Sequence, residues 1–142
     1  MAALRVQRVG DHDFVGRNDR GATVRIGRGG LPGSFSPGEL LQVATAACTA
    51  VTVEQLVTRR VGDDAELVAL AEATRGPDGR EYDLIRVTLR ADLSFLDDEA
   101  RERVVSAMRK AVERECKVSR TVERGARVDL VIDPAENAAE DR

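Results

Sequence analysis

Alternating hydrophobic and polar positions in the first part of the chain predict short β-strands. Residues 3–9 (ALRVQRV) alternate between apolar and polar or charged side chains, as in a strand with one buried face. Residues 14–27 predict two further strands that are joined by a polar turn at residues 17–21. The four glycines and one proline of residues 27–35 (GRGGLPGSF) predict a loop.

The loop is followed by a strong helix start and a long apolar stretch. Ser36 can cap the helix, Pro37 suits its first position, and Glu39 stands where a capping-box carboxylate reaches back to the cap amide. From residue 40 to about residue 57 the chain reads LLQVATAACTAVTVEQLV. Its first two-thirds are apolar or small on every side, which predicts a helix that is buried all round.

Two strand-like stretches come next. Residues 66–74 and 82–92 are separated by Arg75-Gly76-Pro77-Asp78-Gly79-Arg80, whose residue types favour a turn. The two stretches are therefore expected to form a hairpin.

A second helix and a last strand complete the pattern. The helix can be capped by Asp97 or Asp98 and runs to about Glu115, with apolar residues gathered on one face: Val104, Val105, Met108, Ala111 and Val112. Residues 126–132 predict a final strand.

The order of strands, helix, hairpin, helix and strand predicts an α+β fold with antiparallel pairing. A length of 142 residues suits one domain, which we place at residues 1–133. Residues 134–142 are expected to be a disordered, acidic tail.

The amino-acid composition favours an oligomer. The chain has no Trp, one Tyr and three Phe, so Val, Leu and Ala must fill the core. Small aliphatic side chains bury little area each, and a second subunit would enlarge the shared core.

The charge pattern excludes several classes of partner. Charged residues make up 33% of the chain but nearly balance, with a net charge of −3. A basic stripe with interleaved aromatics, typical of nucleic-acid binders, is missing. No apolar run reaches the roughly 18–20 residues of a membrane span, and the first residues do not resemble a secretory signal. We therefore expect a cytoplasmic protein that binds neither nucleic acid nor membrane.

The two cysteines are the candidate chemistry. Cys48 lies twelve residues past the proposed cap, roughly 18 Å along the helix, beyond the reach of the helix dipole. Its neighbours four residues away, Ala44 and Thr52, carry no charge, so a reactive Cys48 needs a cation from elsewhere. Cys116 continues the four-residue spacing of Val104, Met108 and Val112, so it should face the core and could meet the first helix there.

The residues alone leave two readings of these cysteines open. Free cysteine is often a small, inert core residue. Two thiols on facing helices could also form a redox pair if their Cα atoms come within about 7 Å.

The stretches SFSPGELLQVATAACTAVTVEQL and ECKVSRTVERG together resemble the OsmC/Ohr superfamily. In that superfamily a proline and a glutamate at a helix start precede a buried cysteine, and a second cysteine stands in a C-P-x-S pattern. Pro37 and Glu39 before Cys48, and Cys116-Lys117-Val118-Ser119, match this arrangement here.

The resemblance implies an intertwined homodimer in which sheets of both subunits wrap two central helices. It also implies a thiol-dependent peroxidase for organic hydroperoxides or hydrogen peroxide. Cys48 would be the attacking thiolate and Cys116 the resolving thiol, with an external dithiol as reductant. An arginine of the N-terminal hairpin would supply the cation; Arg17 is the first choice and Arg20 the second.

The chain departs from the family pattern at two positions. Gly38 stands where hydroperoxide-resistance members carry the glutamate that pairs with the arginine, and Lys117 replaces the proline after the second cysteine. Glu39 is one step further on, and can replace that glutamate or serve only the capping box. The departures favour a second hypothesis: an OsmC-like small-ligand binding protein or redox sensor without catalysis.

Other chemistries have little support. His12 is the only histidine and lies in a polar turn, so neither a metal site nor a catalytic triad is expected. Gly27-Arg28-Gly29-Gly30 lacks the spacing of a phosphate loop. No cofactor is expected.

Overall fold

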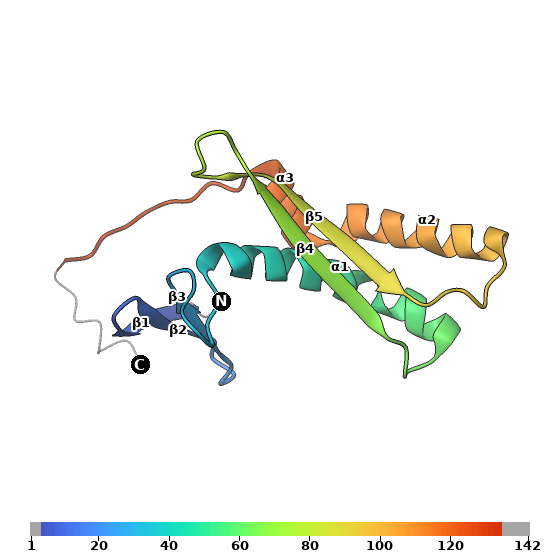
Figure 1. The fold of residues 1–142 in the computed structure, drawn as a ribbon, viewed down its shortest axis with the longest axis horizontal. Helices are drawn as coiled ribbons and strands as arrows, with labels where there is room; N and C mark the ends of the chain where they lie inside the picture. Colours follow the sequence, from blue (N-terminus) through green and yellow to red (C-terminus); the bar gives the residue numbers. More distant parts are fainter. Residues whose placement is uncertain (1–3, 135–142) are drawn as a thin grey trace.

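The structure is a computed structural model that describes residues 4–134. The chain folds into two small antiparallel sheets and three helices (Figure 1). In chain order the elements are β1 (Arg5–Gly10), β2 (Asp13–Arg17), β3 (Thr23–Gly27), α1 (Pro37–Val61), β4 (Leu67–Arg75), β5 (Tyr82–Ala91), α2 (Asp98–Glu115) and α3 (Lys117–Arg124). The predicted α+β class with antiparallel pairing is confirmed.

The N-terminal sheet has the order β1-β2-β3 and lies beside the start of α1 (Figure 1). In its register Val15 pairs with Gln7 on one side and with Arg25 on the other. An ion pair between Arg25 and Asp13, with two bonds of 3.0 and 3.1 Å, ties β3 to β2. Arg25 also donates to the carbonyl of Pro32 at 3.2 Å, which fastens the glycine-rich loop to the sheet.

The helix start predicted at Ser36 is confirmed. The amide of Glu39 donates to Ser36 Oγ at 3.1 Å, and the amide of Ser36 donates to Glu39 Oε1 at 2.9 Å. These two bonds satisfy amides that a helix start otherwise leaves unpaired. α1 continues four residues beyond the predicted end and stops at Gly62, whose φ of 111° favours glycine.

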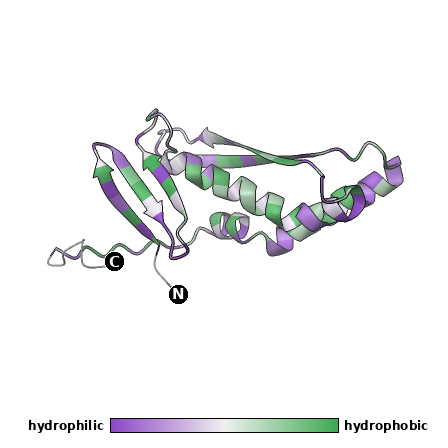
Figure 2. Cartoon of the chain, turned by 90° about the horizontal axis from the view of Figure 1, so that it is seen from below, coloured by the Kyte–Doolittle hydropathy of each residue, from purple (hydrophilic) through white to green (hydrophobic). Residues whose placement is uncertain are grey.

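The β4–β5 hairpin covers α1 and α2 on one side, so that the main body has two layers (Figures 1 and 2). The core between the layers consists of buried aliphatic residues: Val53, Val57, Leu93, Val104 and Met108. Val53 and Val57 are 0% and 1% exposed, which makes this half of α1 the centre of the core.

The expectation that α1 is buried all round is wrong for the single chain. Val51 is 71% exposed and Val43 is 45% exposed, because one hairpin and one helix can cover only one side of it. Hydrophobic and neutral colours run along much of α1 in Figure 2. By length and composition alone α1 could cross a membrane, a test that the core helix of a soluble protein also passes. Its packing against β4, β5 and α2 favours a core helix.

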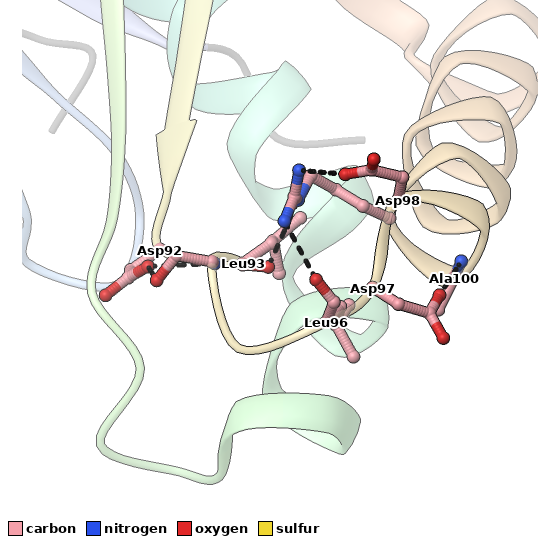
Figure 3. A network of polar contacts seen from close by, with 8 residues as sticks. Asp92, Leu93, Leu96, Asp97, Asp98 and Ala100 are labelled. Carbon is pink, nitrogen blue, oxygen red and sulfur yellow. Dashed lines mark hydrogen bonds and ion pairs between the residues drawn. The ribbon is translucent and has the colours of Figure 1, made fainter.

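Polar contacts define the turn that leads from β5 into α2 (Figure 3). Asp97 caps α2 by accepting a bond of 2.7 Å from the amide of Ala100, as the sequence predicts. Arg101 donates to the carbonyls of Leu96 at 2.8 Å and Leu93 at 3.4 Å. These bonds hold the core residue Leu93 beside the first turn of α2.

The C-terminal part differs from the prediction. Residues 117–124 form α3, which the sequence did not reveal. The strand predicted at 126–132 is wrong in the single chain: these residues form no ladder and are exposed, with Val128 at 90% and Val131 at 81%. A strand needs a neighbouring strand to pair with, and this segment runs away from α2 and α3 without meeting one (Figure 1). The tail expected at 134–142 lies outside the described residues from 135 onward.

Candidate redox site

Cys48 lies at the border between the covered and the uncovered side of α1. Thr45 and Thr49 are buried beside it, whereas Ala44 and Val51 are exposed. The Cys48 side chain is accordingly only partly buried and carries a free thiol. A small molecule can therefore approach Cys48 from the exposed apolar side of the helix.

Cys116 lies at the junction of α2 and α3 and is completely buried, at 0% exposure. Its amide closes α2 by donating to the carbonyl of Val112 at 3.0 Å, and its carbonyl accepts the amide of Arg120 at 3.0 Å. Cys116 is thus both the C-cap of α2 and the N-cap of α3. Its side chain faces α1, as the four-residue spacing along α2 predicts.

Polar groups surround the Cys116 sulfur. Cys116 Sγ lies 3.2 Å from Ser119 Oγ and 3.9 Å from Thr49 Oγ1. The Cys116 thiol donates to Ser119 Oγ. Burial raises the pKa of this thiol, but its hydrogen bonds with the side chain and backbone of Ser119, with Cys48 and with Thr49 outweigh burial and lower the pKa below its ordinary value. Thr49, the residue that follows Cys48 in α1, contacts the Cys116 sulfur. The structure therefore places Cys116 against the part of α1 that carries Cys48.

The two arginines that the sequence predicts as the cation are not bonded to either cysteine in the described part of the chain. Arg17 is exposed at the end of β2, and Arg20 in the following turn lies 3.5 Å from Asp19. Among residues 4–134, no hydrogen bond or ion pair joins Arg17 or Arg20 to either cysteine.

Glu39 is exposed and its carboxylate bonds the amide of Ser36, so it performs the capping role. The space beside the preceding residue, Gly38, is occupied by a side chain from another element. A Cβ at Gly38 would overlap the hydroxyl oxygen of Tyr82, the first residue of β5, and would lie 3.1 Å from its Cζ. The half-buried Tyr82 ring thus occupies the space that a side chain at residue 38 would need.

A groove of about 1000 Å³ lies between β5 and α2. Leu89, Met108 and Val112 give it apolar walls, and it extends to Thr49 of α1, the residue that contacts Cys116. Within residues 4–134, no group of three or more His, Cys, Asp or Glu side chains is placed to hold a metal ion.

Two residues beside the Cys116 sulfur were given no role of their own in the sequence analysis. Ser119 was noted only as the serine of the C-x-x-S match, and its place in the first turn of α3 was not expected because that helix was not predicted. Thr49 directly follows Cys48 and gave no signal of its own.

Comparisons with known proteins identify the family of the chain. A family model described as OsmC-like protein matches residues 29–131. Uncharacterized proteins of Mycobacterium tuberculosis and Mycobacterium bovis are 39% identical over 132 residues, which is 93% of this chain and 96% of theirs.

Solved structures share the fold. A hypothetical protein from Aquifex aeolicus has a TM-score of 0.66 at 18% identity and covers 89% of both chains. A putative osmotic stress induced and detoxification response protein from Psychrobacter arcticus has a TM-score of 0.62 at 18% identity, covering 85% of this chain and 88% of its own. The organic hydroperoxide resistance protein OhrB of Bacillus subtilis has a TM-score of 0.53 at 23% identity, covering 87% and 92%. The chain belongs to the OsmC-like protein family and has the fold of its OsmC/Ohr neighbours.

Proposed function

We propose that the protein is a thiol-dependent peroxidase that reduces organic hydroperoxides or hydrogen peroxide. The observation that carries the proposal is the position of two free thiols: Cys48 is partly exposed on α1, and the buried Cys116 sulfur contacts Thr49, the next residue of α1, at 3.9 Å. A neighbour of the same fold that is named for organic hydroperoxide resistance supports it.

The proposed reaction uses both sulfurs in turn. The Cys48 thiolate attacks the distal peroxide oxygen; a sulfur–oxygen bond forms, the oxygen–oxygen bond breaks and an alcohol leaves. Cys116 then attacks the resulting Cys48 sulfenic acid, a disulfide forms and water leaves. An external dithiol reduces the disulfide by exchange and is itself oxidised. The apolar side chains of α1 around Cys48, including Leu41 and Val51, favour a hydrophobic hydroperoxide, and they would line its path between the two chains of a dimer.

We infer that the working form is a homodimer. Val43 and Val51 of α1 are exposed, and so are the apolar residues of the C-terminal segment: Val128, Leu130, Val131 and Ile132. A soluble protein rarely leaves that much apolar surface uncovered. A second chain could cover α1, pair with the segment at 126–132, and bring Arg17 or Arg20 to Cys48. The arginine would lower the pKa of Cys48 and orient the peroxide.

The proposal places this enzyme in the cytoplasm, with no nucleic-acid or membrane partner. The near-balanced charge and the packing of α1 inside the domain support this placement.

The test is a peroxidase assay with a small dithiol as reductant and an organic hydroperoxide as substrate. We expect turnover by the natural protein and none by Cys48→Ser. If Cys48→Ser keeps full activity, the assignment is wrong. Ser106→Ala, an exposed change on α2, is a matched control that should keep the activity.

The second candidate is a small-ligand binding protein or redox sensor. Gly38 favours it, because Tyr82 leaves no room there for a carboxylate that would pair with an arginine. Titration of free thiols separates the two. Rapid loss of both thiols after one equivalent of organic hydroperoxide supports the enzyme, whereas unreactive thiols support the binding protein.

A further inference from the structure

The proposed cycle ends when an external dithiol reduces the disulfide, and the two cysteines differ in how easily a dithiol can reach them. In thiol–disulfide exchange a thiolate attacks one of the two sulfurs, and access helps to decide which one. Cys48 is only partly buried, whereas Cys116 is 0% exposed. The structure therefore bears on which sulfur receives the reductant.

Cys116 is enclosed by its own chain. It lies where α2 meets α3, and both helices pack against α1. Ser119 Oγ and Thr49 Oγ1 flank its sulfur at 3.2 and 3.9 Å. A second chain that docks on this fold can only add cover to the sulfur, so Cys116 is enclosed in a dimer as well.

The backbone of Cys116 holds the sulfur in this position. Its amide donates to the carbonyl of Val112 at 3.0 Å, and its carbonyl accepts the amide of Arg120 at 3.0 Å. Moving Cys116 to the surface would break bonds at the end of α2 and at the start of α3. We therefore expect its sulfur to remain inside the domain when the disulfide forms.

We propose that the reductant attacks the sulfur of Cys48 and that Cys116 is the leaving thiolate. This inference rests on the proposed peroxidase function and deepens it, because it assigns the reducing half of the cycle to the sulfur that also meets the peroxide. The proposed function already requires a path by which a peroxide reaches Cys48, and a thiol can use the same path.

The steps balance as follows. A thiolate of the dithiol attacks the Cys48 sulfur, a mixed disulfide forms on Cys48, and the bond to Cys116 breaks. The second thiolate of the dithiol then attacks the first sulfur of the dithiol, so the reductant leaves with its own disulfide and Cys48 is released. Two electrons pass from the dithiol to the protein, and the two protons that the dithiol loses restore the cysteine thiols. A monothiol lacks the second step, so Cys116 can displace it from Cys48 and close the disulfide again.

The first test locates the mixed disulfide. The protein is oxidised with one equivalent of an organic hydroperoxide, treated briefly with the monothiol 2-mercaptoethanol, and quenched with excess N-ethylmaleimide in denaturant. Peptide mass spectrometry should find mercaptoethanol on Cys48 and maleimide on Cys116. The reverse arrangement would overturn the proposal.

A second measurement does not depend on the lifetime of the mixed disulfide. Cys116→Ser leaves only Cys48, Cys48→Ser leaves only Cys116, and each variant is mixed with an aromatic disulfide reagent. In the folded protein Cys48 should react faster than Cys116 by a factor of about 10 or more, because a buried thiol reacts only when the structure opens. In denaturing urea, which is the control, the two thiols should react at similar rates.

Equal rates in the folded protein, or a faster Cys116, would overturn this inference while leaving the peroxidase proposal intact. If the natural protein forms no disulfide after hydroperoxide, the proposed function fails instead, and this inference fails with it.

Discussion

Replacing Gly38 by alanine should destabilise the protein, although the same change normally favours a helix. The added Cβ would overlap the Tyr82 hydroxyl and lie 3.1 Å from its Cζ and 3.4 Å from its Cε2. Inside a helix, alanine is more stable than glycine by up to about 1 kcal/mol, whereas overpacking lowers the stability of a protein by about 1–3 kcal/mol. We expect the free energy of unfolding to fall by about 1–2 kcal/mol because the half-buried ring must move.

The assay is urea unfolding followed by circular dichroism, at fixed protein concentration and with the cysteines reduced. Tyr82→Phe removes the hydroxyl but keeps the ring, so Gly38→Ala should cost less in that background, with a coupling of about 1 kcal/mol. Gly29→Ala is the matched control: a Cβ there meets nothing within 4 Å, and the change should be neutral or slightly stabilising. An equal effect of Gly38→Ala in both backgrounds would refute the reasoning.

Further predictions concern the helix start, the core and two titrating groups. Ser36→Ala should lower the free energy of unfolding by about 1 kcal/mol because the cap bonds are lost, measured by urea unfolding. Val53→Ala should cost about 2 kcal/mol in the same assay, because it leaves a cavity in the core. The hydrogen bond from Arg25 lowers the pKa of Asp13, so Arg25→Gln should raise that pKa in an NMR titration of the carboxyl group. Burial raises the pKa of Cys116, but its hydrogen bonds outweigh burial and lower the pKa below its ordinary value of 9.0. The ionised thiol therefore stabilises the folded protein at alkaline pH, and this stabilisation is lost as the pH falls through the folded-state pKa. Under reducing conditions, the stability of the natural protein relative to Cys116→Ser should therefore rise from neutral pH toward about pH 9, and a constant difference would contradict this.

Local chemistry made much of the fold predictable from the sequence. Ser36, Pro37 and Glu39 specify a helix start that depends on neighbours within four residues, and Asp97 does the same for α2. The turn between β4 and β5 is fixed by its glycines and proline. The facing of Cys116 toward α1 also follows from spacing, since it continues the apolar stripe of α2.

What the sequence did not predict depends on contacts far along the chain or outside it. The α3 helix carries two apolar residues, Val118 and Val122, which is too little for a periodic signal. The segment at 126–132 has strand residues but no partner strand in the single chain. The partial exposure of Cys48 likewise depends on which side of α1 the hairpin and α2 cover.

The most direct experiment is mass spectrometry of the reduced protein after one equivalent of an organic hydroperoxide and no reductant. We predict the loss of two hydrogens from each chain and a single peptide pair that joins Cys48 to Cys116 within one chain. Unmodified thiols, or a sulfenic acid that persists on Cys48 while Cys116 stays reduced, would contradict a redox pair at this site.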